Sequence, residues 1–280
     1  MAEPDRPTQR EYWNSKVGEE WARQADRTDK MFAALTQAVF DALDLQPGEG
    51  VLDIGCGAGE TTLAAARRVG GNGHVVGVDL SQPLLALGRR RAQQSGLAID
   101  LVEADAAAAA IPGAPFDAAF SRFGVMFFDD PAAAFARIRQ HLRPGGRLVF
   151  ACWRTFAENA WSRAPLDALS PMLKAPLPPP DQNLPGPFAF ADAGKIRTIL
   201  EASGWRGVSI ERWDAPLRLG ADAEDAAAYV LRIGPSARAI ADHGLDAAAA
   251  KQLIVARLAD AQDAAGVSLA AACWIVRATA

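Results

Sequence analysis

Residues 51–61 read VLDIGCGAGET, and this stretch decides the fold. It starts as an apolar run typical of a buried strand, passes through three closely spaced glycines and continues as a helical sequence. Glycine is needed in such a turn because a Cβ would block both the tight bend and the close approach of a ligand to the backbone. The stretch therefore predicts a strand, a ligand-binding turn and a helix, in that order.

Short apolar runs alternate with helical stretches downstream of this turn. The expected strands are HVVGVDL (74–80), AIDLVEA (98–104), FDAAFS (116–121) and GRLVFACW (146–153), followed late in the chain by GVSIERW (207–213) and VSLAAACWIVRATA (267–280). Strands that alternate with helices indicate a parallel sheet, and right-handed crossovers place helices on both of its faces. The predicted fold class is therefore α/β.

The glycine turn departs from the motif of dinucleotide-binding proteins. Glu60 stands where the pattern G-x-G-x-x-G requires its third glycine, which disfavours NAD. Asp53 and Glu60 also flank the glycines with negative charge, whereas a dinucleotide turn must receive a pyrophosphate. The turn suits a cationic ligand instead, and S-adenosylmethionine (SAM) carries both a sulfonium and an ammonium group.

Polar residues recur where the next three strands end. Asp79 closes its strand about 20 residues after the turn, where a carboxylate can accept hydrogen bonds from both ribose hydroxyls. Asp105 follows the next strand and can accept from an adenine amino group, with Leu80 and Ala106 lining the ring. Ser121 ends the strand after that, beside the expected position of the methyl group. Ligands of open α/β sheets bind at these carboxyl ends.

Together with LRPGGRLVF at 142–150, these segments resemble the class I SAM-dependent methyltransferases, in the branch similar to the quinone-methylating and other small-molecule enzymes. The resemblance is strong over 50–153 and weak in the C-terminal region. It implies a Rossmann-like, mostly parallel seven-stranded sheet of order 3-2-1-4-5-7-6, in which the last two strands form an antiparallel hairpin. It also implies an enzyme that transfers the methyl group of SAM.

Carried over to this sequence, the resemblance also assigns ligand contacts around the turn. The cofactor-binding residues that it implies, together with those at the strand ends, are Asp53, Gly55, Gly57, Gly59, Asp79, Leu80, Asp105, Ala106 and Ser121. Asp53 and the glycine backbone would meet the methionine part of SAM. Members of the family often cover SAM with an aromatic side chain from an N-terminal helix, and Tyr12, Trp13 and Trp21 are the candidates.

We expect a single methyltransferase domain over the whole chain. Helical spacing of apolar residues predicts an N-terminal helical cap at 1–45, ahead of a SAM-binding core at 46–155. An acceptor-side insertion with helices would occupy 156–264, and the final strand 265–280. Within the insertion, residues 174–190 carry too many prolines for a helix or a central strand, which predicts an inserted cap or lid.

Composition excludes several other functions. The net charge of −4 comes without a basic stripe, so nucleic acid is not an expected substrate. No apolar run approaches the roughly 20 residues that a membrane span needs, and we expect a cytoplasmic enzyme. The three cysteines lack metal-ligand spacing, so no metal site is predicted. Monomer and homodimer both remain open.

The acceptor is expected to be a small, apolar or aromatic molecule. The predicted pocket residues follow the fourth and fifth strands and are Phe123, Met126, Phe127, Phe128, Trp153, Trp161, Phe188 and Phe190. Transfer to oxygen, nitrogen or carbon is left open. No catalytic residue is assigned, because no histidine or carboxylate has a position that compels the role of a base. The alternatives are a nucleotide-dependent oxidoreductase and a non-catalytic SAM-binding sensor or subunit.

Overall fold

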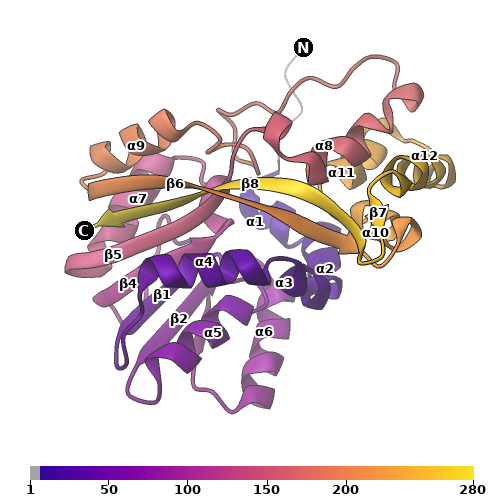
Figure 1. Cartoon of the computed structure of the whole chain (residues 1–280). Coiled ribbons are helices and arrows are strands. Elements are labelled where there is room, and N and C mark those ends of the chain that lie inside the picture. Colours follow the sequence, from indigo (N-terminus) through magenta and orange to yellow (C-terminus); the bar gives the residue numbers. More distant parts are fainter. Residues whose placement is uncertain (1–6) are drawn as a thin grey trace.

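A single mixed sheet forms the centre of the molecule (Figure 1). The computed structural model describes residues 7–280, so the first six residues of the expected N-terminal cap lie outside it. The strands are β1 (Gly50–Ile54), β2 (His74–Asp79), β3 (Asp100–Glu103), β4 (Phe116–Arg122), β5 (Leu142–Trp153), β6 (Arg206–Gly220), β7 (Gln262–Asp263) and β8 (Gly266–Thr279).

The order of the sheet is β3-β2-β1-β4-β5-β8-β6, and the two-residue β7 pairs only with β8. The first five strands are parallel, whereas β8 runs antiparallel to both β5 and β6. Because β8 occupies the place expected for a seventh strand, the predicted order 3-2-1-4-5-7-6 is confirmed. The short β7 was not predicted.

Helices cover both faces of the sheet. They are α1 (Gln9–Trp13), α2 (Lys16–Arg23), α3 (Ala25–Met31), α4 (Ala33–Leu43), α5 (Glu60–Val69), α6 (Gln82–Ser95), α7 (Pro131–Gln140), α8 (Ala160–Asp167), α9 (Ala193–Ala202), α10 (Ala223–Val230), α11 (Pro235–His243) and α12 (Ala247–Ala259), with short 3₁₀ helices η1 (Gly124–Phe127), η2 (Phe156–Glu158) and η3 (Ser170–Met172). Figure 1 shows α4, α5 and α6 on one face, with α7 and α9 on the other.

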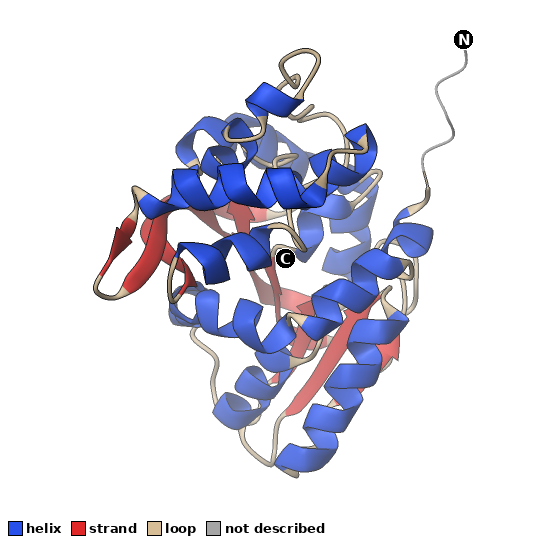
Figure 2. Ribbon diagram, turned by 90° about the vertical axis from the view of Figure 1, so that its right-hand side faces the viewer, coloured by secondary structure: helices blue, strands red, loops and turns tan. Residues whose placement is uncertain are grey.

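The long β6–β8 hairpin connects two hydrophobic cores. The larger core includes Leu217 and Ile275 and fills both faces of the sheet. The smaller core includes Leu219 and Val267 and lies among α8, α10 and α12. Viewed from the end that carries these helices, much of the sheet lies behind them (Figure 2). The hairpin therefore places a helical layer next to the carboxyl ends of the parallel strands.

Aspartate side chains begin four of the helices. Asp130, Asp192, Asp222 and Asp246 each accept an N–H from the first turn of α7, α9, α10 and α12, respectively. This satisfies donors that a helix start otherwise leaves unpaired. By contrast, residues 174–190 form neither helix nor strand, as their proline content predicts.

The turns that follow β1 and β4 lie backbone against backbone. Gly55 has a φ of +71°, and a Cβ added there would come within 2.7 Å of the Cα of Gly124. An L side chain is disfavoured in this left-handed region and would also collide with immobile backbone. Glycine is therefore required at Gly55 by conformation and by space.

We expect Gly55→Ala to lower the free energy of unfolding by about 2–4 kcal/mol, the sum of left-handed strain and overpacking. Urea denaturation would measure the loss. Gly71→Ala is the matched control, because nothing lies within 4 Å of a Cβ there and its φ lies outside the left-handed region. Equal stabilities of the two variants would contradict the close approach of the two turns.

Candidate active site

A cavity of about 480 Å³ opens at the carboxyl ends of the parallel strands. Its wall contains residues from the turns after β1, β2, β3 and β4, together with N-terminal and C-terminal helices. Of the residues predicted to bind the cofactor, those that line it are Gly55, Gly57, Asp79, Leu80, Asp105 and Ala106. Asp53, Gly59 and Ser121 do not line it.

Asp79 ties the glycine turn to the end of β2. One carboxylate oxygen accepts from the N–H of Gly57 at 2.8 Å, and the other accepts from the N–H of Ser81 at 2.8 Å. Burial raises the pKa of Asp79, while these backbone hydrogen bonds oppose the rise. Each carboxylate oxygen can accept more than one hydrogen bond, so Asp79 retains capacity for ligand hydroxyls.

Asp105 shapes the neighbouring part of the wall. Its Oδ1 accepts from the N–H of Ala107 at 2.9 Å, and its Oδ2 bonds no other residue within 7–280. Asn14 approaches from the N-terminal segment and donates from its amide to the carbonyl of Leu80 at 2.8 Å. The end of β2 and the loop after β3 thus border one recess, which the N-terminal segment covers.

Asp53 and Ser121 lie behind the turn. Asp53 is fully buried, and its Oδ2 accepts from the hydroxyls of Thr61 and Thr62 at 2.7 Å each. Ser121 Oγ donates to the carbonyl of Ile54 at 2.7 Å and accepts from the N–H of Gly124 at 3.0 Å. The other Asp53 oxygen, Oδ1, is buried without a hydrogen-bond partner within residues 7–280. Both side chains therefore hold the strand end and the turns in position.

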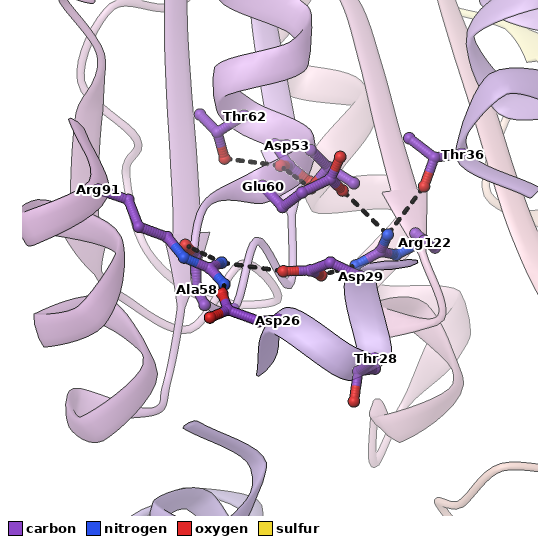
Figure 3. A network of polar contacts seen from close by, with 12 residues as sticks. Asp26, Thr28, Asp29, Thr36, Asp53, Ala58, Glu60, Thr62, Arg91 and Arg122 are labelled. Atoms are coloured by element: carbon purple, nitrogen blue, oxygen red, sulfur yellow. Dashed lines mark hydrogen bonds and ion pairs between the residues drawn. The ribbon is translucent and has the colours of Figure 1, made fainter. Parts of the chain in front are cut away.

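A chain of ion pairs joins helix α3 to the glycine turn (Figure 3). Arg122, at the end of β4, donates to Glu60 at 3.0 Å and to Asp29 at 2.9 Å. The second oxygen of Asp29 accepts from Arg91 on α6 at 2.9 Å. Glu60 is consequently neutralised by a partner, which the sequence argument about the charge of the turn did not include. Asp29 lies 93 residues from Arg122, so no local pattern indicates the pair.

Aromatic side chains of the N-terminal helices cover the same cavity. Trp13 and Trp21 line it, whereas Tyr12 does not. The Trp13 ring meets Phe127 edge to face at a centroid distance of 5.2 Å. The Trp13 carbonyl also accepts from Ser81 Oγ at 2.9 Å, which fixes α1 over the start of α6. Two of the three candidate aromatics are thus in place to cover a ligand.

The other half of the cavity is aromatic. Phe123 stacks on Trp153 with centroids 4.2 Å apart and an interplanar angle of 14°, and Trp161 lies 4.7 Å from Trp153. Phe123 has a φ of +72°, an uncommon conformation for a bulky residue that turns the chain at the end of β4. The predicted pocket residues Phe188 and Phe190 are core residues and do not line the cavity.

Helices α3, α10 and α11 contribute wall residues that the sequence did not suggest. They include Thr28 from α3, Tyr229 from α10 and Pro235 from α11. The Tyr229 hydroxyl and Thr28 Oγ1 form a buried hydrogen bond of 3.1 Å, and burial raises the pKa of Tyr229. Of residues 174–190, only Pro187 lines the cavity, so most of this side is formed by helices.

Charge around the cavity is predominantly negative. The carboxylates in its wall are Asp29, Glu60, Asp79, Asp105, Asp129 and Asp130, and the only basic residue among the described lining residues is Arg122. No histidine of residues 7–280 lines it. The same residues contain no cluster of three or more His, Cys, Asp or Glu side chains suited to a metal. They also contain no helix with the length and apolarity that crossing a membrane requires.

Known proteins share both the sequence and the fold. Residues 51–146 match a family described as a methyltransferase domain. The chain is 31% identical over 197 residues to nocamycin O-methyltransferase from Saccharothrix syringae, covering 68% of this chain and 70% of that protein. It is 40% identical over 113 residues to demethylmenaquinone methyltransferase from Thermus thermophilus, covering 40% of this chain and 50% of that one.

A solved structure has the same fold along nearly the whole chain. Phosphoethanolamine N-methyltransferase 2 from Haemonchus contortus, in complex with phosphomonomethylethanolamine and S-adenosylhomocysteine, aligns with a TM-score of 0.59. The alignment covers 99% of this chain and 61% of that one, at 18% identity. At this identity the likeness demonstrates the fold alone.

The sheet order and the glycine turn define a Rossmann-like protein of the class I type. The relatives make the assignment specific, and the chain belongs to the SAM-dependent methyltransferase family. It is therefore an enzyme with SAM as its cofactor, and it is a methyltransferase rather than an oxidoreductase.

Asp53 provides a test of the turn through pH. Burial raises its pKa to about 7 from 3.8, against the opposing effects of the two threonine hydroxyls and Arg122. A carboxyl that binds its proton more tightly when folded stabilises the protein at acidic pH, and this contribution is lost as the pH rises toward the folded pKa.

We therefore expect the wild type to lose roughly 2–3 kcal/mol of stability relative to Asp53→Asn between pH 5 and pH 8. Urea unfolding of both proteins across this range would measure the difference, because other titrating groups cancel between them. A difference that does not change with pH would show that Asp53 is ionised throughout.

Proposed function

We propose that the enzyme methylates a small, apolar or aromatic molecule held against the stacked rings of Phe123 and Trp153. The observation that carries the proposal is that one cavity connects the glycine turn with this aromatic wall. Aromatic faces favour flat apolar molecules, and a few polar groups in such a pocket fix their orientation. Here the buried Thr28–Tyr229 hydroxyl pair provides such groups.

Two relatives support a small-molecule acceptor by their names, which refer to nocamycin and demethylmenaquinone. The chain spans half the length of the second of these proteins. The negative wall of the cavity adds an electrostatic argument, since six carboxylates against one arginine disfavour an anionic acceptor. A neutral aromatic metabolite fits both observations better than a nucleic acid.

For SAM itself we propose the following placement. The methionine part lies along the backbone of Gly55 and Gly57, and the ribose hydroxyls donate to Asp79. The adenine stands by Leu80 and Ala106, with its amino group toward the Oδ2 of Asp105. Asp53, Gly59 and Ser121 act indirectly, by holding the turn in this shape.

Alignment is the main contribution that these residues can make to the reaction. With SAM bound, the acceptor atom would attack the methyl carbon in line with the sulfur as the carbon–sulfur bond breaks. S-adenosylhomocysteine would leave, and the proton of a neutral acceptor would pass to water. Holding two reactants in such a geometry is worth about 7–11 kcal/mol in well-oriented reactions. His141 is not available as a base in the cavity, because it lies outside the wall and its Nε2 contacts the Ala109 carbonyl at 3.1 Å.

We expect Asp79→Asn to weaken SAM binding by more than about tenfold, because the charge-assisted bonds to two hydroxyls are weakened. Isothermal titration with SAM would measure the change. Asp100→Asn, an exposed substitution on the neighbouring strand β3, is the control and should bind as the wild type does. An Asp79→Asn protein with unchanged affinity for SAM would contradict the proposal that Asp79 binds the ribose hydroxyls.

Trp161→Ala tests the acceptor wall. We expect it to reduce methyl transfer by about tenfold or more while leaving SAM affinity within about threefold, because it removes aromatic contact from one half of the cavity only. The assay follows label from methyl-labelled SAM into a panel of neutral phenols and quinones extracted into organic solvent. Trp213→Ala, on edge strand β6 and away from the cavity, is the control. Label found only in nucleic acid or protein would contradict the proposed acceptor class.

A further inference from the structure

The charges in the cavity wall leave one part of SAM without an obvious partner. SAM carries a carboxylate on its amino acid end, in addition to its ammonium and sulfonium groups. A carboxylate that enters a cavity with six carboxylates in its wall needs a compensating cation, because like charges at close range repel and desolvation adds to the cost. Among the described lining residues, Arg122 is the only cation.

Arg122 also lies beside the turn that receives the amino acid end. Strand β4 pairs with β1, and Arg122 is the last residue of β4. Its guanidinium bonds Glu60 at 3.0 Å, and Glu60 is the first residue of α5, directly after the glycines. The Arg122 guanidinium therefore contacts the side chain of the residue that directly follows the glycine turn.

The guanidinium of Arg122 is both fixed and incompletely bonded. Its Nη1 donates to Thr36 at 2.8 Å and to Glu60, and its Nη2 donates to Asp29 at 2.9 Å. An arginine has five N–H donors, so Nε–H and one Nη2 hydrogen have no acceptor within residues 7–280. The side chain is only 13% exposed, which limits competition from water.

The surrounding carboxylates complete a site for a zwitterion. Asp29 and Glu60 line the cavity next to Arg122 and can face the ammonium group of an amino acid. Arg91, outside the wall, pairs with the other oxygen of Asp29. Arg91 also pairs with Asp26, so the whole cluster holds three carboxylates and two arginines. An amino acid end carries one charge of each sign and therefore adds no net charge to this cluster.

We propose that Arg122 binds the carboxylate of the amino acid end of SAM, while Asp29 and Glu60 orient it. This role rests on the proposed placement of SAM. It makes Arg122 the residue that distinguishes SAM from its adenosine fragment, which lacks the carboxylate. Arginine suits the task because its planar group offers several fixed donors to a carboxylate.

Two ligands that differ in the amino acid end provide the test. S-adenosylhomocysteine has the carboxylate and the ammonium, whereas 5′-methylthioadenosine has the same adenosine and thioether without them. We expect Arg122→Gln to weaken S-adenosylhomocysteine binding by about tenfold or more and 5′-methylthioadenosine binding by less than about threefold, measured by titration calorimetry. Arg122→Lys keeps the positive charge, so it should change the ratio of the two affinities less than Arg122→Gln does. The lysine variant replaces the glutamine variant in the test if the latter does not fold.

The matched control is Arg147→Gln, which breaks the ion pair of another partly buried arginine, with Glu49, at a site outside the cavity wall. It should leave the ratio of the two affinities unchanged. Equal loss of both ligands in the Arg122 variants, or no loss, would overturn the inference and leave the SAM site intact. A wild-type protein that binds neither SAM nor S-adenosylhomocysteine would overturn the proposed placement as well, so the two failures are distinct.

Discussion

Backbone contact between the turns after β1 and β4 fixes both halves of the active site. Gly55 and Gly124 approach so closely that neither accepts a Cβ, and Ser121 bonds to both turns from behind. Because β1 and β4 are neighbours in the sheet, this contact also brings the ends of the two strands together. The cofactor turn and the first residues of the acceptor wall are consequently parts of one packed unit.

Phe123 links the two halves. Its left-handed backbone directs the chain from β4 into η1 and presents the ring to Trp153. Phe123 directly precedes Gly124, which contacts the glycine turn. Strain of this kind persists only where the surrounding structure fixes it, and here the stacked ring and the Phe123 N–H bond to the Ala151 carbonyl do so. The conformation places an aromatic surface next to the expected position of the SAM methyl group.

Sequence patterns predicted the sheet and the strand-end positions, because both depend on local periodicity and on the geometry of parallel strands. They did not predict the hydrogen bonds of Asp53, which the resemblance assigned to the methionine part of SAM and whose buried carboxylate accepts from Thr61 and Thr62. The Asp29–Arg122 ion pair could not be predicted from local patterns either, since it joins elements distant in sequence. Tyr229 belongs to a helix whose position depends on the β6–β8 hairpin, which no local signal determines.

The two halves of the site come from different parts of the chain, and this separation limits what relatives can tell about the acceptor. The matched family segment, residues 51–146, contains the turns that surround the cofactor but ends before Trp153 and Trp161. Those rings, and Tyr229 from the helical layer beyond them, line the part of the cavity that we assign to the acceptor. Substitutions in this wall can change the acceptor while the packed turns stay the same. Identity in the matched segment therefore bears on the use of SAM and on Phe123, whereas Trp153, Trp161 and Tyr229 lie outside it.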